Sequence, residues 1–332
     1  MKAKTILKKG MTTFAVVMLL CIVAAAQEHE SPLPKYSKST PDAILNSNSR
    51  YIAVFGDIQN YITTNTNVQY YIESLEWIAS HAGTIRFMMH TGDVTNNNYV
   101  SQWELFHSTT SPIAEVLPFY TCIGNHDYIC NAPNIWNHRD STRFSDYVGF
   151  PTTASHIAAY YAPGHYENIL IREELFENDP IYLLILELEP RRAVVRWADS
   201  LVQTIPDDRI ILITHRFVNA NGNRYRNKNY MTDSESSAPQ YVWDSLIFRN
   251  DNIRCVLCGH VSSQSRVLYS TNSKGRIVPQ IEFNIQRQPH GGNGLIELWE
   301  FDREGDVFVR TYNTHTERFA NDSISEFQFK FR

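Results

Sequence analysis

Short apolar runs alternate with stretches of helical spacing over most of this chain, and that alternation restricts the fold more than any other feature. The runs lie at residues 51–55, 85–89, 119–123, 181–188, 210–213 and 253–257. Apolar residues recur at helical spacing after the first run, from Val68 to Ala79, and after the fourth, from Val194 to Ile205. Such alternation is typical of parallel sheets, whose strand ends open on a crevice where ligands bind. The pattern predicts an α/β fold with a site at the strand ends.

Two parts of the chain depart from this alternation. The segment from Tyr128 to Asn178 is aromatic and polar, and we expect it to form loops and short helices along one wall of a cleft. Later in the chain the apolar period changes to two, which predicts antiparallel strands at 281–283, 295–301 and 307–312.

A polar residue able to hold a cation follows five of the runs. These residues are Asp57, Asp93, Asn125, His215 and His260, with Gln59 two positions after the first. Each alone is usually a turn or cap residue, but recurrence at equivalent strand ends favours a metal site. Carboxylate, amide and imidazole ligands suit a pair of cations, which can neutralise a phosphoester and hold the attacking and leaving oxygens of a displacement.

The whole set of strand ends resembles the calcineurin-like metallophosphoesterase family. The matching motifs are Gly56-Asp57-Ile58-Gln59, Gly92-Asp93, Gly124-Asn125-His126-Asp127, Thr214-His215 and Gly259-His260-Val261. The resemblance implies a four-layer α/β/β/α sandwich of two mixed sheets flanked by helices, with a dinuclear centre at the strand ends. It also implies that Asp93 bridges both ions, that Asp57 binds the first, and that Asn125, His215 and His260 bind the second. By the same resemblance His126 is the general acid or transition-state stabiliser, with Asp127 orienting its ring.

Two departures from the family pattern fall on the same ion. The family usually has histidine where this chain has Gln59, and a second histidine where it has Ser262. An amide oxygen can still coordinate, whereas a neutral serine hydroxyl is a poor ligand, so we expect a weaker and more oxygen-rich first site. We therefore expect one or two divalent ions, from among Mn, Mg, Fe, Zn and Ca, with the first site weak or vacant.

These features predict a metallophosphoesterase that cleaves a small phosphomonoester or phosphodiester by attack of metal-bound water or hydroxide. A catalytically weak or inactive metal-containing binding protein of the same fold is the alternative, favoured by the two departures. A third hypothesis, a zinc or redox site at Cys255 and Cys258, lacks the second cysteine pair that a zinc site needs. Two candidate substrate contacts are Arg191, which follows the run 181–188, and His290, which lies in a glycine-containing loop.

The first 26 residues differ from the rest, because four lysines precede an apolar run from Phe14 to Ala26. This is typical of a secretory signal peptide cleaved after Ala26. An uncleaved anchor is the alternative, but the run is shorter than the roughly 20 residues of a membrane-spanning helix. We expect a secreted or periplasmic protein without a membrane anchor, with a leader at 27–49 and a single domain at 50–332.

The net charge of the remaining chain disfavours nucleic acid as a partner. Without residues 1–26 it carries 26 basic and 35 acidic residues, a net charge of −9. Because nucleic acid is a polyanion, this balance disfavours non-specific association. We expect no nucleic-acid binding.

Overall fold

The computed structural model describes residues 45–332 apart from 133–134, 137–138, 262–264 and 321–325. The predicted signal peptide, most of the predicted leader and Ser262 therefore lie outside the described residues. Leu45, in the predicted leader, is buried in the core, and Ser49 Oγ donates to Glu300 Oε1 at 2.8 Å. Residues 45–49 thus pack against the domain that we expected to begin at residue 50.

The described part of the chain forms two mixed seven-stranded sheets, of which the first has its parallel strands on one side, out to the edge strand. These are β1 (Arg50–Phe55), β2 (Ile85–His90) and β3 (Phe119–Thr121). β13 (Leu295–Phe301) lies antiparallel to β1 and pairs with β14 (Asp306–Asn313). β14 also pairs with β15 (Arg318–Phe319) and β16 (Glu326–Lys330). The antiparallel strands predicted at 295–301 and 307–312 are confirmed.

The second sheet has a parallel centre and antiparallel edges. Its parallel strands are β8 (Asp179–Ile185), β9 (Ile210–Ile213), β10 (Ile253–Cys258) and β12 (Ile277–Glu282). β7 (Ile169–Phe176) and β6 (Ile157–Tyr160) extend one edge, and β11 (Arg266–Thr271) forms the other. The strand expected at 281–283 is the end of β12, which pairs antiparallel with β11, as predicted, and parallel with β10 on its other side, because β11 returns the chain across the sheet edge.

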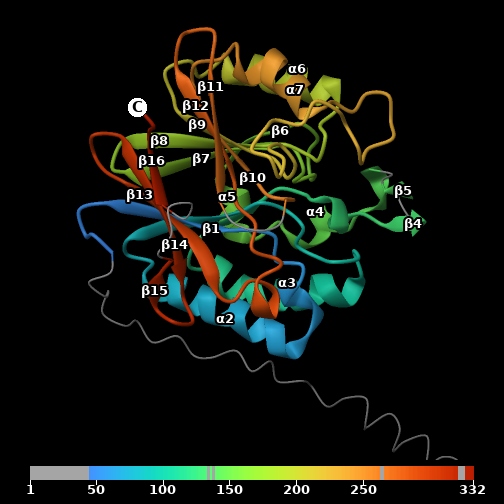
Figure 1. The fold of residues 1–332 in the computed structure, drawn as a ribbon, viewed down its shortest axis with the longest axis vertical. Coiled ribbons are helices and arrows are strands. Elements are labelled where there is room, and N and C mark those ends of the chain that lie inside the picture. The colour runs from blue at the N-terminus through green and yellow to red at the C-terminus, as the bar shows by residue number, and fades with distance from the viewer. Residues whose placement is uncertain (1–44, 133–134, 137–138, 262–264, 321–325) are drawn as a thin grey trace, which may run out of the picture. The chain divides into compact units, whose positions relative to one another are not determined.

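The helices cover the outer faces of the two sheets (Figure 1), with α2 (Asn65–Ser80) and α3 (Val100–Ala114) against the first and α6 (Arg192–Val202) and α7 (Pro239–Val242) against the second. α7 continues as a π-helical turn, Trp243–Ile247. α2 begins where Thr64 Oγ1 accepts from Asn67 N at 3.1 Å. None of the described helices is long and apolar enough to cross a bilayer.

The apolar runs are continuous because their strands are buried on both faces. On β8, Leu183 and Ile185 pack between the sheets, whereas Leu184 packs beneath α6. The two core clusters therefore lie on opposite faces of the second sheet, and the predicted four-layer α/β/β/α arrangement is confirmed.

The segment 128–178 was expected to contain loops and short helices, and that prediction is only half right. It does contain α4 (Phe144–Tyr147) and α5 (Pro151–Ser155), with a two-stranded sheet of β4 (Cys130–Ala132) and β5 (Ile135–Trp136). It also contains β6 and β7, which were not predicted. β7 was not recognised in the sequence because residues 172–174 are all charged. One of them, Glu173, is nevertheless buried and accepts a hydrogen bond from the Tyr120 hydroxyl. Short 3₁₀ turns lie at Tyr61–Thr63, Asn125–Asp127, Arg139–Ser141 and Pro289–Gly291.

A carboxylate on β13 links the stability of the fold to pH. Glu297 is fully buried, and it accepts hydrogen bonds from Trp299 Nε1 at 2.8 Å and from Ser265 Oγ. Burial raises the pKa of Glu297 from 4.5 to about 7, although both hydrogen bonds oppose that rise. The folded protein therefore keeps this proton to a higher pH than the unfolded chain does.

Glu297→Gln is expected to flatten the pH dependence of unfolding. The stabilisation from the raised pKa is complete below about pH 4.5 and is lost as pH rises through about 7. At 1.36 kcal/mol per pKa unit, the wild-type protein should lose roughly 3 kcal/mol more than the variant across that window. Urea unfolding of both proteins from about pH 5 to about pH 8 measures the difference; parallel curves would contradict it.

Candidate metal centre

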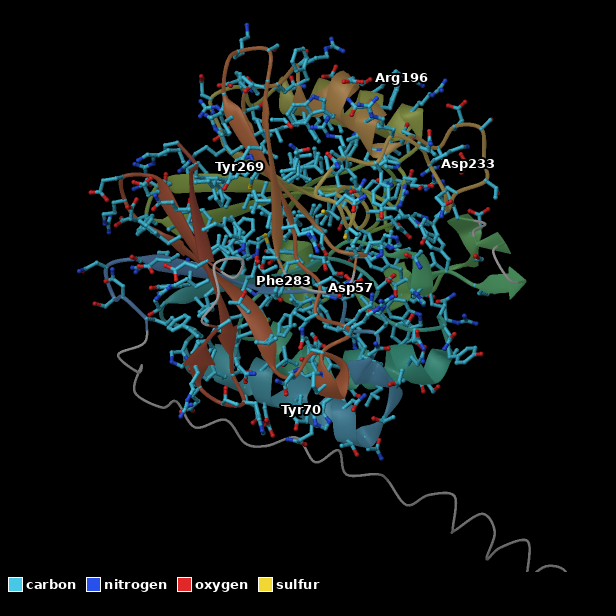
Figure 2. The ribbon with its side chains drawn as sticks, viewed as in Figure 1. Asp57, Tyr70, Arg196, Asp233, Tyr269 and Phe283 are labelled. Carbon is cyan, nitrogen blue, oxygen red and sulfur yellow. The ribbon has the colours of Figure 1, made fainter. Side chains whose placement is uncertain are left out.

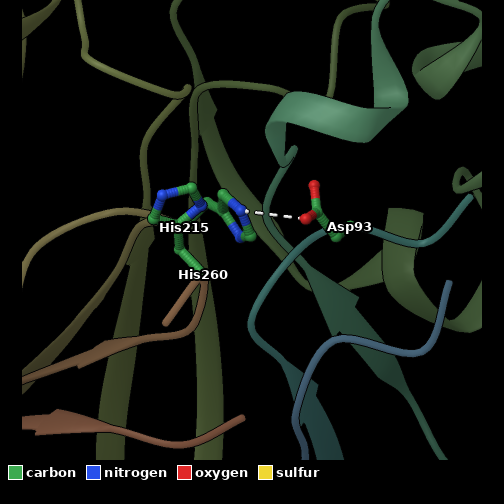
Figure 3. A group of neighbouring side chains, drawn as sticks. All are labelled: Asp93, His215 and His260. Carbon is green, nitrogen blue, oxygen red and sulfur yellow. Dashed lines mark ion pairs between the residues drawn. The ribbon is translucent and has the colours of Figure 1, made fainter. Parts of the chain in front are cut away.

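Three metal-ligating side chains converge from the two sheets. Asp93 follows β2, His215 follows β9 and His260 follows β10, and one ligand atom of each lies within 4.8 Å of the others. Figure 3 shows the Asp93 carboxylate opposite the two imidazoles. The strand ends predicted to meet therefore do meet, but the crevice lies between two facing sheets rather than along one.

The backbone around these ligands is held in uncommon conformations. Asp93 and His260 have φ of 55° and 75°, in the left-handed region that side chains other than glycine rarely adopt. Two nearby glycines allow carboxylates to approach the backbone closely. A Cβ at Gly124 would overlap the Asp93 carboxylate, and a Cβ at Gly259 would overlap the Asp57 carboxylate. Strain of this kind concentrates at functional sites, and the close approach of the carboxylates explains the glycines at positions 124 and 259.

His215 is oriented so that its Nε2 nitrogen faces the cluster. Its Nδ1 lies 2.8 Å from the carbonyl oxygen of Thr91, which can only accept, so Nδ1 carries a hydrogen. Its Nε2 lies 3.3 Å from Asp93 Oδ2 and 3.1 Å from Asn125 Oδ1. Burial lowers the pKa of His215, but the Asp93 and Asp57 carboxylates raise it to about 9. The oxygens of Asp93 and Asn125 therefore meet Nε2 at a point that favours positive charge.

His260 is the complementary neutral ligand. Burial, with the neighbouring His215, lowers its pKa to about 3, so the ring keeps a lone pair on one nitrogen. The Tyr230 hydroxyl lies 3.1 Å from its Nε2. A partner on one ring nitrogen fixes an imidazole ligand for metal binding through the other. Asp93, Asn125, His215 and His260 together fit one divalent cation.

Tyr230 is positioned by a buried ion pair that the sequence did not reveal. Glu189 Oε1 accepts from Arg216 Nη1 at 2.8 Å and from Asn229 N at 2.6 Å. Its Oε2 accepts from Tyr230 N and Met231 N, each at 2.9 Å. Arg216 follows His215 directly in the chain, so Glu189 ties the loop that carries Tyr230 to the metal-ligand segment.

Asp127 does not have the environment expected of a group that orients His126. Its carboxylate accepts from the backbone nitrogens of Val94, Thr95 and Gly124 at 2.8 to 3.2 Å. Burial raises the pKa of Asp127 to about 6, against those hydrogen bonds. His126 Nδ1 instead lies 2.8 Å from the Asn96 carbonyl oxygen. Asp127 therefore shapes the loop after Asp93, and that loop orients His126.

The position of the other implied ion has a different character. Asp57 is fully buried, and burial raises its pKa to about 8 while His215 opposes the rise. Asn284 Nδ2 donates to Asp57 Oδ2 at 2.6 Å, and Gln59 Nε2 lies 3.3 Å from Asp93 Oδ2. The amide hydrogens of Asn284 thus face Asp57, which does not fit a cation bound at that oxygen.

The two candidate substrate residues lie in unlike surroundings. Arg191 forms a two-pronged ion pair with Glu187, with Nε and Nη2 at 2.9 and 3.0 Å from its oxygens. It lines a cavity of about 430 Å³. His290 stacks on Tyr70 at a centroid distance of 4.4 Å. Figure 2 shows Tyr70 on α2, well apart from Asp57, so His290 lies away from the ligand cluster.

The cysteines give no support to a zinc or redox site. Cys255 and Cys258 lie three residues apart on β10, and they pack in different core clusters on opposite faces of the sheet. Both are free thiols, and burial raises the pKa of each well above its usual range. Their thiols therefore cannot share an ion, and neither is activated as a nucleophile.

Comparison with known proteins agrees with this architecture. Residues 50–263 match the family model described as calcineurin-like phosphoesterase. The uncharacterized protein YvnB of Bacillus subtilis (strain 168) is 25% identical over 273 residues, which is 75% of this chain and 19% of that protein. This chain thus spans about a fifth of that relative's length.

A solved structure is similar in fold. It is the purple acid phosphatase PPD1 from yellow lupin (Lupinus luteus) seeds, with a TM-score of 0.54 at 13% identity. The superposition covers 86% of this chain and 54% of that one. At this identity the likeness concerns the fold alone.

Proposed function

This chain belongs to the calcineurin-like phosphoesterase family, and we propose that it hydrolyses a small phosphomonoester or phosphodiester with the help of a divalent metal ion. Members of this family are metal-dependent phosphoester hydrolases. The observation that carries the proposal is the meeting of Asp93, His215 and His260 within 4.8 Å of one another.

The residues that would hold the ion have the chemistry it requires. Asp93 supplies a carboxylate, Asn125 an amide oxygen, and His215 and His260 supply imidazole nitrogens, a set common to several transition metals. When bound there, a divalent ion neutralises phosphoryl charge and lowers the pKa of water. Asp93 also accepts from His126 N at 2.8 Å through its other oxygen, which joins the ligand cluster to the loop of the proposed acid.

His126 is the proposed proton donor to the leaving oxygen. The Asn96 carbonyl oxygen holds its Nδ1–H at 2.8 Å, so its Nε2 is the nitrogen that exchanges a proton. The ring is partly buried, on the 3₁₀ turn next to Asn125. Its orientation therefore depends on the Asp93–Asn98 loop, which Asp127 braces.

The organic part of the substrate is proposed to occupy the cavities beside this loop. One of about 210 Å³ is lined by residues 96–99 with Tyr128 and Arg143. Tyr128 and Arg143 also line the larger cavity of about 430 Å³, which extends to Arg191. Because Glu187 neutralises Arg191, this wall suits a polar or aromatic group better than a second phosphate.

Turnover of simple substrates tests the proposal. The purified protein is incubated with aryl phosphate monoesters and diesters, each with Mn, Mg, Zn, Fe or Ca. Hydrolysis of one substrate class with at least one metal is expected. Absence of turnover with every metal, with the wild type no better than Asp93→Asn, would overturn it.

His126→Ala is expected to lower kcat by about 10²-fold with a smaller change in KM, because general acid catalysis contributes roughly that factor. Steady-state kinetics with a poor leaving group, such as an alkyl phosphate, measure the loss best. A leaving group that needs no proton should reduce the deficit. His107→Ala, on the exposed face of α3, is the matched control; equal losses in both variants would contradict the role.

A metal-holding binding protein of the same fold is the second candidate function. The Asn284 amide hydrogens that face Asp57 favour it, because they weaken the case for a second ion. Tight binding of phosphorylated ligands without turnover, measured by calorimetry on metal-loaded protein, would support this alternative.

A further inference from the structure

We propose that this centre is built for a single cation, and that the side-chain amide of Asn284 takes the place of the other ion by binding Asp57. The inference rests on the proposed metal centre but concerns the number of ions, which can be measured without any turnover. It also assigns Asn284, Gln59 and Gln286 to the site, of which Asn284 and Gln286 were not predicted.

Asp57 already has donors on both of its oxygens. Its Oδ2 accepts from Asn284 Nδ2 at 2.6 Å and from His260 N at 3.1 Å. Its Oδ1 accepts from Thr91 Oγ1 at 3.0 Å, with His260 N at 3.3 Å. A carboxylate offers about four lone-pair sites. These contacts satisfy the Asp57 carboxylate without a cation.

The orientation of the Asn284 amide is fixed by the backbone. Its Oδ1 accepts from Gln286 N at 2.9 Å. A backbone N–H can only donate, so the oxygen must lie on that side and the NH₂ group must face Asp57. Turning the amide over would place two donors against each other and two oxygens against each other. Hydrogen atoms therefore point at Asp57 Oδ2, the oxygen that Asn284 contacts.

The position beside Asp93 is filled by two more amides. Gln59 Nε2 lies 3.3 Å from Asp93 Oδ2, the same oxygen that faces His215, and it also contacts Gln286 Oε1. Asn60 Nδ2 donates to the Gln286 carbonyl oxygen at 2.8 Å, which holds the two loops together. Asp93 thus has the cation position on one side and a neutral amide on the other.

Gln59 is the adjustable member of this group. Its Oε1 is buried and has no hydrogen-bond partner among the described residues, so no backbone group fixes its amide as Gln286 N fixes that of Asn284. The Asn284–Asp57 contact therefore carries the inference. The sequence also favours a single ion, because Ser262, which lies outside the described residues, is a poor metal ligand.

Metal counting on matched variants tests this. Protein is stripped with a chelator, reloaded with excess Mn²⁺ and desalted, and metal per chain is measured by mass spectrometry beside the Mn²⁺ resonance spectrum. One ion per chain is expected, with the spectrum of an isolated Mn²⁺. Asp57→Asn and Asp93→Asn are isosteric changes, and we expect the first to retain the ion and the second to lose it.

The opposite pattern would overturn the inference. Two ions per wild-type chain with a spin-coupled spectrum, falling to one in Asp57→Asn, would mean that Asp57 is a ligand. Thermal unfolding of both variants excludes global misfolding, and the wild-type count stands without either of them. Asn284→Asp replaces the two amide hydrogens by an acceptor, so it should gain a second Mn²⁺; an unchanged count would contradict the role of Asn284.

The outcome is separable from that of the proposed function. One ion without turnover would retain this inference and overturn hydrolysis. Two ions with turnover would do the reverse.

Discussion

Asp93→Asn is expected to lower kcat/KM for an aryl phosphate by at least about 10³-fold. Asp93 Oδ2 lies 3.3 Å from His215 Nε2, and its Oδ1 accepts from His126 N at 2.8 Å, so it contacts both the ligand cluster and the loop of the proposed acid. A bound ion contributes several kcal/mol to transition-state charge stabilisation, and each 1.36 kcal/mol is tenfold in rate. Steady-state kinetics at saturating metal measure the loss.

A matched control separates this effect from a general loss of carboxylate. Asp207 lies on the exposed turn between α6 and β9, and Asp207→Asn should leave kcat/KM unchanged. Asparagine at position 93 keeps an oxygen that can accept from His126 N, so the loop should remain folded. An Asp93→Asn enzyme within tenfold of wild type would remove Asp93 from the centre.

Glu189→Gln is expected to lower the free energy of unfolding by about 3 kcal/mol. The change keeps the size of the side chain but leaves the buried Arg216 without its counter-charge, and breaking a buried ion pair from one side typically costs 3–5 kcal/mol. It also weakens the hold on the backbone of Tyr230 and Met231. Activity should fall with stability, because the Tyr230 contact to His260 loosens. Denaturant unfolding and kinetics on the same samples measure both.

Glu174→Gln is the control for that experiment. Glu174 pairs with Arg172 at 3.2 Å on β7, but both side chains are more than 40% exposed. Exposed pairs contribute roughly 0–1 kcal/mol. Similar losses in the two variants would show that burial of the Glu189–Arg216 pair is not what stabilises it.

The parts of the fold that could be predicted are those whose strands are mostly apolar. β1, β2, β9 and β10 are buried along most of their length, so their apolar runs and the polar residues that follow can be recognised in the sequence. β7 was missed because its buried positions include Glu173, whose partner Tyr120 lies 53 residues away. A buried charge paired across the fold cannot be told from an exposed one in the sequence.

The candidate site follows the same division. Asn284 lies two residues after β12, as Asp57 lies two residues after β1, so the signal that identified the other strand ends applied to it as well. Glu189 directly follows the run 181–188 and carried the same signal. Tyr230 had no such signal, because its contact with the centre depends on how a long loop folds back. For Asp127 the sequence shows only that it is next to His126, and its backbone partners near Asp93 depend on the fold.

The hydrogen bonds that Glu189 accepts from the backbone of residues 229–231 also indicate which part of this loop could be replaced. They fix the base of the loop at residues 229–231, while positions 220, 221, 223 and 226 stand exposed on the tip. Loops held at their base tolerate replacement at their tip with little disturbance to the core. For redirecting this scaffold to a new compound, the exchangeable residues are therefore 219–223, because Arg224 and Tyr225 hold the following part of the loop against Gln280 and Arg216.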